Sequence, residues 1–200
     1  MAAPQPDPLV PLELRDRILV AATELFAERG YAATSMRDIS LAVGCTKPAL
    51  YYHFNNKAAL FEEIAEREMR RIRASILESF ARPQSVRDCL IDAIRAHFDY
   101  ILGNEAAVRV LMRSELQKDA GQPHFEGTDI REFYAEQSLK LLRRGVDTGE
   151  IRSDVDLEDV VYVLAGAVDL RAALWICERF PIPSDYPERI IAVVFGGISP

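Results

Sequence analysis

The segment from Thr46 to Phe54, which reads TKPALYYHF, gathers side chains suited to contact with nucleic-acid phosphates. A threonine hydroxyl, a lysine ammonium, two phenols and an imidazole can all donate hydrogen bonds. Thr46 is a favourable N-cap. Pro48 fits the first helical turn, because the N–H that proline lacks has no intrahelical partner there. Since the amino end of a helix attracts anions, the segment predicts a short helix whose start lies against phosphates.

Two patterns before this segment predict the helices that hold it in place. The first helix carries apolar residues at helical spacing, namely Ile18, Ala22, Leu25 and Phe26. It ends at Gly30, which can adopt the positive φ of a helix terminus. The second helix begins with Ser35 and Asp38, which form a capping-box pattern with Thr34 as an alternative cap, and it ends at Gly44. A glycine between two short helices is typical of a helix-turn-helix motif.

Residues 15–61 resemble, almost position by position, the N-terminal domain of the TetR/AcrR family of transcriptional regulators. In that family three N-terminal helices bind DNA, and the third is the recognition helix. Pro48 departs from the pattern, since the family commonly has Gly, Ala or Ser there, and its ring adds bulk at the groove-facing end. The side chains that the resemblance implies as contacts to DNA phosphates or the groove are Thr34, Ser35, Arg37, Thr46, Lys47, Pro48, Tyr51, Tyr52, His53 and Lys57.

The whole chain is predicted to be all-α. The proline-rich residues 1–11 are expected to form a disordered arm, residues 12–56 the DNA-binding domain, and residues 57–200 a larger helical effector-binding and dimerisation domain. Apolar periodicity and turn residues predict a long helix over 55–80 and further helices over 84–102, 105–118, 129–148, 157–179 and 186–196. No stretch alternates convincingly enough to predict a strand.

The last two predicted helices carry an unusual amount of apolar surface. Residues 157–180 are apolar on nearly every face, so this helix must be covered on several sides. The two helices either complete the core of one subunit or form an interface with the same helices of a second subunit. The family resemblance favours the interface, which is also what reading two half-sites requires. The expected interface residues are Val161, Leu164, Ala165, Val168, Ile190, Ile191, Val194 and Phe195.

Aromatic and methionine side chains populate the helices that enclose an inducer cavity in similar proteins. The candidates for such a pocket are Phe98, Met112, Phe125, Phe133, Tyr134, Tyr162 and Trp175, although side chains of this kind at helical spacing also build ordinary cores. His97 and His124 are further candidates. Neither has a second ligand at metal-binding spacing, so no metal and no cofactor is expected.

Charge is distributed in a way that suits a DNA-binding protein, although the net charge is −7. Residues 1–60 are neutral overall. Within residues 31–60 the basic residues are Arg37, Lys47 and Lys57, and the acidic residue is Asp38. The remaining residues carry the net negative charge, so a locally basic surface joins an acidic body.

Three widely spaced cysteines argue against a disulfide framework. The absence of a signal peptide or an apolar run long enough to span a membrane predicts a cytoplasmic protein.

The resemblance to the TetR/AcrR family implies a homodimeric repressor that leaves a palindromic operator when a small, largely apolar ligand binds. The alternative is an activator, or a helical interaction protein of the same fold that needs no effector. An enzyme is not expected, because no nucleophile elbow, phosphate-binding loop or HExxH motif occurs in the chain.

Overall fold

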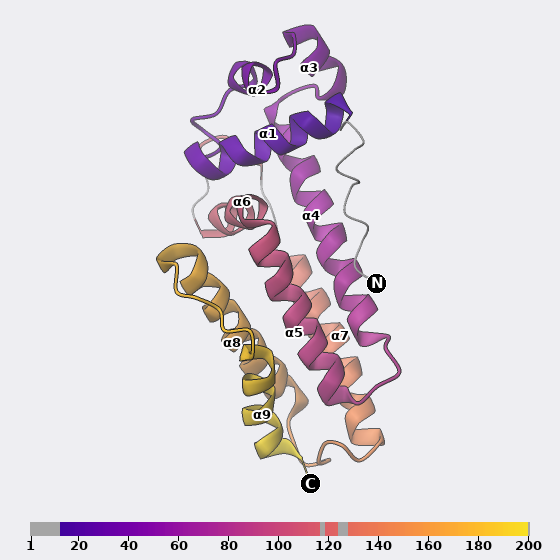
Figure 1. Ribbon diagram of the computed structural model, residues 1–200. Coiled ribbons are helices and arrows are strands. Elements are labelled where there is room, and N and C mark those ends of the chain that lie inside the picture. Colours follow the sequence, from indigo (N-terminus) through magenta and orange to yellow (C-terminus); the bar gives the residue numbers. More distant parts are fainter. Residues whose placement is uncertain (1–12, 117–118, 124–127, 200) are drawn as a thin grey trace. The chain divides into compact units, whose positions relative to one another are not determined.

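A computed structural model describes residues 13–116, 119–123 and 128–199. These residues form helices without any strand, in agreement with the predicted all-α class (Figure 1). The predicted arm over residues 1–11 and the candidate Phe125 lie outside the described residues. The helices are α1 (Leu14–Arg29), α2 (Met36–Val43), α3 (Lys47–His53), α4 (Lys57–Phe80), α5 (Val86–Gly103), α6 (Glu105–Leu116), α7 (Thr128–Asp147), α8 (Leu157–Glu178) and α9 (Tyr186–Ile198).

The ends of the N-terminal helices follow the capping residues that the sequence indicates. Gly30 closes α1 with a φ of 88°. Ser35 and Asp38 form the predicted capping box at the start of α2. Gly44 ends α2 in the left-handed region, which costs little only for a residue without a Cβ atom. Thr46 then caps α3 by accepting a hydrogen bond from the Ala49 amide at 3.3 Å.

The chain divides into two compact units, and α4 runs through both of them. The first unit holds α1, α2, α3, the part of α4 up to Arg70, and α6; the second holds the rest of α4 with α5, α7, α8 and α9. The first unit therefore extends past the predicted boundary at residue 56, because Leu60, Phe61 and Ile64 of α4 and Val110 of α6 pack in the same core as α1 and α2.

Three aromatic rings form the centre of the first unit. Phe26 of α1, Tyr31 of the following turn and Phe61 of α4 lie with ring centroids 5.5 to 6.1 Å apart. The Phe61 ring meets each of the others at a steep angle, which is a favourable arrangement for aromatic pairs. The α1–α2 turn is thus anchored to the start of α4.

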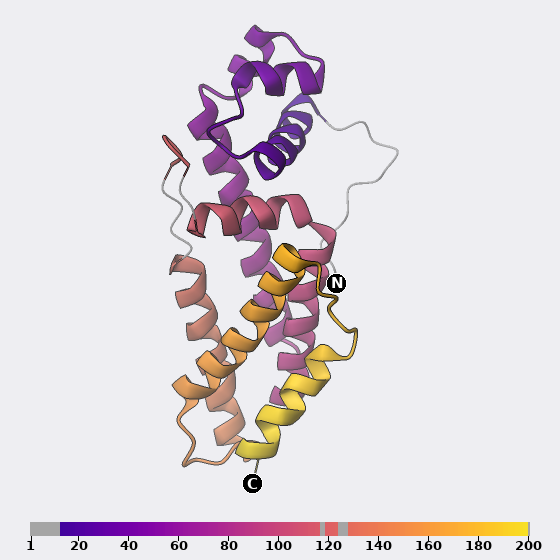
Figure 2. The same cartoon turned by 90° about the vertical axis from the view of Figure 1, so that its left-hand side faces the viewer.

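In the second unit, α5 packs against α9 and α7 packs against α8, while α8 and α9 lie side by side (Figure 2). Gly145 of α7 permits one of the closest contacts in this unit. A Cβ atom there would lie 2.7 Å from the Ile151 Cδ1 atom, so any larger residue would collide with a buried side chain.

Helix α8 is long and apolar enough, by length and composition alone, to cross a membrane. The sequence prediction concerned uninterrupted apolar runs, and Glu158, Asp159, Asp169 and Arg171 interrupt this helix; by mean hydropathy alone, Leu157–Glu178 passes the test. The helix nevertheless contacts α5, α7 and α9, and it carries Asp169 and Arg171 in its second half. Surface helices that pair with another subunit are equally apolar, so composition alone does not indicate a membrane span.

Candidate DNA-binding helix and ligand cavity

Helix α3 is held by two buried anchors and exposes the rest of its surface. Leu50 has no exposed surface and Phe54 is 4% exposed, so both belong to the core of the first unit. Tyr51 is 48% exposed and Tyr52 is 86% exposed. An exposed phenol offers a partner both a flat apolar ring and a hydroxyl that can donate a hydrogen bond.

The remaining predicted contacts on α3 share this open surface. Thr46, Lys47 and Pro48 are exposed at its amino end, where α3 presents backbone N–H groups. His53 is half-buried, and its ring meets the Tyr52 ring edge-on at a centroid distance of 5.2 Å. The amino end of α3 thus combines hydrogen-bond donors, one cation and two flat rings.

Helix α2 supports α3 and adds two exposed candidates of its own. Ser35 and Arg37 are exposed in the first turn of α2. The hydroxyl of Ser35 hydrogen-bonds the Asp38 carboxylate at 2.5 Å, and this bond lowers the pKa of that carboxyl group. The other end of α2 is fixed to α1, since the Arg17 guanidinium donates to the Val43 carbonyl at 2.6 Å.

Thr34 and Lys57 do not take the positions that the family pattern implies. Thr34 is 1% exposed, and its hydroxyl donates to the carbonyl of Gly30 at 2.9 Å. The Lys57 ammonium donates to the carbonyls of Tyr31 and Thr34 at 2.7 and 2.8 Å and lies 4.1 Å from the centre of the Tyr31 ring. Burial lowers the pKa of Lys57. Both side chains hold the α1–α2 turn in place, so the prediction that they contact DNA is corrected.

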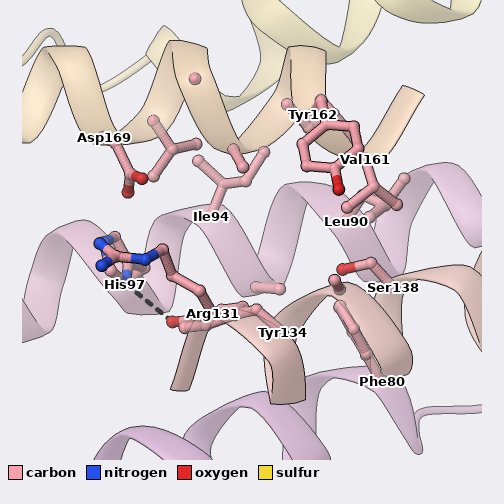
Figure 3. A pocket seen from close by; sticks show the side chains of 16 residues that line it. Phe80, Leu90, Ile94, His97, Arg131, Tyr134, Ser138, Val161, Tyr162 and Asp169 are labelled. Atoms are coloured by element: carbon pink, nitrogen blue, oxygen red, sulfur yellow. Dashed lines mark hydrogen bonds between the residues drawn. The ribbon is translucent and has the colours of Figure 1, made fainter. Parts of the chain in front are cut away.

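A cavity of about 360 Å³ lies in the second unit between α5, α7 and α8, with the end of α4 beside it (Figure 3). Most of its wall is aliphatic or aromatic. The predicted candidates Tyr134 and Tyr162 line it, as does His97. Four other lining residues had been predicted at the subunit interface, namely Val161, Leu164, Ala165 and Val168. The lining residues for which the sequence analysis predicted no role are Phe80, Leu90, Ala93, Ile94, Arg131, Ala135, Ser138, Gly166 and Asp169.

Four of the predicted pocket residues pack elsewhere. Phe98 is buried and meets the Tyr186 ring edge-on. Phe133 lies beneath the Arg73 guanidinium at 5.5 Å, and Trp175 lies beneath that of Arg179 at 5.6 Å. Met112 belongs to α6 in the first unit. These side chains complete the packing of their helices and do not line the cavity.

The cavity contains a half-buried polar pair at one end. The Nδ1 atom of His97 lies 2.9 Å from the Tyr134 hydroxyl, a bond drawn as a dashed line in Figure 3. Burial lowers the pKa of His97 to about 4, because a charged imidazole would lose its hydration there. Burial also raises the pKa of Tyr134, with a smaller contribution from the nearby Asp169 carboxylate. Both side chains are therefore neutral at physiological pH.

The predicted interface residues divide into two groups. Within the second unit, Val161, Leu164, Ile191, Val194 and Phe195 are all less than 10% exposed. They belong to the core of the protomer, which corrects their assignment as surface residues. Ala165 is exposed, while Val168 and Ile190 are half-buried.

Other apolar residues of α8 and α9 face solvent instead. Val163 is 57% exposed, Leu170 is 63% exposed and Val193 is 74% exposed. Their spacing places Val163 and Leu170 two turns apart on one side of α8. Gly166 and Gly196 are exposed as well, and nothing lies within 4 Å of the position that a Cβ atom would occupy. We call this set, Val163, Gly166, Leu170, Val193 and Gly196, the apolar stripe.

Comparison with known proteins places this chain in a family. The sequence pattern of the family described as "Bacterial regulatory proteins, tetR family" matches residues 18–64. The chain is 30% identical to the HTH-type transcriptional activator FasR of Mycolicibacterium smegmatis, over 94% of this chain and 84% of that protein. It is 28% identical to the HTH-type transcriptional repressor KstR2 of the same species, over 96% of this chain and 94% of that protein.

A solved structure supports the same assignment along the whole chain. The ketosteroid transcriptional regulator KstR2 of Mycobacterium tuberculosis superposes with a TM-score of 0.75 at 25% identity, covering 96% of this chain and 97% of that one. Both units are therefore shared, and the similarity is not confined to the helix-turn-helix. The chain belongs to the TetR family, whose members are DNA-binding transcriptional regulators and not enzymes.

Proposed function

We propose that the protein is a homodimer that binds a palindromic operator through α3 of each protomer and dissociates when a small, largely apolar ligand occupies the cavity. The observation that carries the DNA-binding part is the exposed amino end of α3. Lys47, Tyr51 and Tyr52 project from a helix whose orientation is fixed by two buried anchors. Such a surface suits phosphate contacts from the lysine and apolar contact of the rings with sugars or thymine methyl groups.

The apolar stripe supports the homodimer. Fully burying a valine or leucine side chain contributes about 1.5 to 3 kcal/mol. Val163, Leu170 and Val193 are 57 to 74% exposed, so covering them in a dimer would contribute the corresponding part of this value from each protomer, against the entropic cost of association. The exposed glycines allow the backbones of two helices to approach closely. Such a dimer presents two copies of α3, as two half-sites about 34 Å apart require.

The cavity supports a small ligand, and α4 offers a route from the cavity to α3. Its volume of about 360 Å³ falls within the range of small-molecule sites. Phe80, the last residue of α4, lines the cavity. Lys57, the first residue of α4, binds the α1–α2 turn. A ligand that favours a different position of α4 would lower operator affinity, since only differential affinity for two states shifts their balance.

Charge reversal at Lys47 tests the DNA-binding surface. We expect Lys47→Glu to abolish the electrophoretic shift of DNA that flanks the gene for this protein, while circular dichroism and dimer content stay as in the wild type. Lys140→Glu is the matched control, because Lys140 is exposed on α7 in the second unit and pairs there with Glu136 at 2.7 Å. If the Lys47→Glu protein still binds the DNA at moderate salt, the assignment of α3 as the reading helix is wrong.

Activation is the second candidate, because one of the similar proteins, FasR, is described as an activator. The same surfaces serve either outcome, since the position of the operator relative to the promoter decides the effect on transcription. A reporter gene placed behind the bound DNA separates the two. Expression falls when a repressor is supplied and rises when an activator is supplied.

A further inference from the structure

We propose that His97 and Tyr134 recognise an uncharged oxygen, a hydroxyl or a ketone, on an otherwise apolar ligand. This inference rests on the proposed function in taking the cavity as the ligand site, and it adds the chemical class of the ligand. The two residues come from different helices, α5 and α7, and meet at one end of the cavity (Figure 3).

The hydrogen bond between the two side chains leaves complementary groups for a ligand. If the Tyr134 hydroxyl donates to Nδ1 of His97, the Nε2 atom carries the proton and donates to a ligand oxygen. If Nδ1 donates to the phenol oxygen, the phenol proton is available to a ligand and Nε2 accepts. Among the described residues, Tyr134 is the hydrogen-bond partner found for His97. The pair can therefore satisfy a ketone, which only accepts, and a hydroxyl, which does both.

Charge at this end of the cavity disfavours an ionised ligand. A carboxylate placed against His97 would be removed from water without a cationic imidazole to compensate, since a pKa of about 4 leaves the ring neutral at physiological pH. Arg131 and Asp169 also line this end, as Figure 3 shows. They carry opposite charges and both are exposed, so the Asp169 carboxylate opposes the attraction of Arg131 for an anion, and salt screens both.

The remaining wall requires an apolar body. Phe80, Leu90 and Val161 form the opposite end of the cavity, where Ser138 supplies a hydroxyl (Figure 3). An aliphatic or polycyclic hydrocarbon fills such a space favourably, because burial of its surface contributes about 25 cal/mol per Å². The ligand class that follows is a largely hydrocarbon alcohol or ketone.

Three probes of equal chain length test the inference: 1-decanol, 2-decanone and decanoate. Binding to the full-length protein is measured at pH 7.5 by isothermal titration calorimetry, with the fluorescence of Trp175, the one tryptophan in the chain, as a second readout. We expect the alcohol and the ketone to bind about tenfold or more tightly than the carboxylate, because its charge is not compensated.

Variants assign the selectivity to the pair. Tyr134→Phe removes the hydroxyl with little change in shape and should weaken alcohol binding by about three- to tenfold, the effect of one neutral hydrogen bond. The same variant should leave the affinity for decanoate unchanged. Ser138→Ala removes a hydroxyl at the far end of the cavity and should leave the preference for the alcohol as in the wild type. His97→Gln should retain binding of the alcohol better than His97→Phe does.

The outcomes separate this inference from the proposed function. Recognition of an uncharged oxygen is wrong if decanoate binds more tightly than 1-decanol, or if Tyr134→Phe lowers the affinity for both compounds equally. The cavity would still be a ligand site in either case. If wild-type protein binds none of the three probes, or if Ala135→Trp, which fills the cavity, binds them as the wild type does, the cavity itself is not the site. DNA binding by the unliganded protein is independent of every one of these results.

Discussion

Acid should destabilise this protein through the half-buried imidazole of His97. In the unfolded chain the imidazole takes up a proton as the pH falls through its ordinary pKa of about 6.5, whereas in the folded protein it does so only near pH 4. Between these two values the unfolded state binds more protons than the folded state. The free energy of unfolding therefore falls as the pH falls through this window, and it is unaffected by His97 above pH 7.

The size of the effect follows from the same two values. Each pH unit inside the window costs up to about 1.4 kcal/mol. Lowering the pH from about 7.5 to about 4.5 should therefore remove about 2.5 kcal/mol of stability per protomer through His97 alone. Typical domains have 5 to 15 kcal/mol in total, so this is a substantial share.

Urea unfolding at the two pH values measures the loss, with all proteins at the same concentration because the proposed dimerisation would also contribute to stability. His97→Gln should lose about 2.5 kcal/mol less than the wild type on acidification, since glutamine has no proton to gain. Tyr134→Phe is the control: it breaks the hydrogen bond but keeps the ring buried, and burial is the cause of the lowered pKa. If His97→Gln and wild type lose stability equally, the imidazole is not buried in the folded protein.

Three further substitutions have expected outcomes. Ser35→Ala removes the cap of α2 and should lower the free energy of unfolding by about 1 kcal/mol in urea titrations. Lys57→Met leaves the carbonyls of Tyr31 and Thr34 without their donor, so it should cost about 1 to 3 kcal/mol; a change within error would mean that the ammonium is solvated. Leu170→Glu places a charge on the apolar stripe and should yield monomers in sedimentation experiments, whereas Leu41→Glu, at the equally exposed Leu41 of α2, should remain dimeric.

The helix bounds were predictable because their signals are local. The capping box of Ser35 and Asp38 acts within a few residues along the chain, as do the helix ends at Gly30 and Gly44. The structure shows the capping contacts that these residues predict. The face of each amphipathic helix followed from apolar spacing in the same way, as Ile18 and Phe26 of α1 illustrate. Family resemblance added the role of α3, which spacing alone leaves open.

Side-chain direction was less predictable, because it depends on partners distant in sequence. Thr34 matches the family pattern by position, yet its hydroxyl turns inward to a carbonyl at the end of α1. Lys57 is drawn to the same turn by two carbonyls and by the ring of Tyr31. A sequence motif places the Cα atom of such a residue but does not decide whether the side chain faces solvent or protein.

Helix α8 shows a second limit. Because it is apolar on nearly every face, its periodicity does not indicate which side packs inside the protomer. Val161 and Leu164 were expected at the surface and lie in the core, while Val163 and Leu170 of the same helix are exposed. The cavity was predicted only in part: Tyr134, Tyr162 and His97 were candidates, whereas the aliphatic residues of its wall come from separate helices and carry no signal individually.

The inward position of Lys57 changes the electrostatics of the proposed DNA surface. Of the three basic residues within residues 31–60, Arg37 and Lys47 remain exposed. The proposed dimer would bring about four such cations to DNA, and each phosphate neutralised changes the slope of log K against log salt by about 0.9. A slope near −4 is modest for a specific DNA-binding protein, so one protomer alone would bind weakly. If the proposed dimer pairs through the apolar stripe, this pairing contributes to operator affinity together with the chemistry of α3. Leu170→Glu should then weaken DNA binding although it lies far from α3 in the sequence.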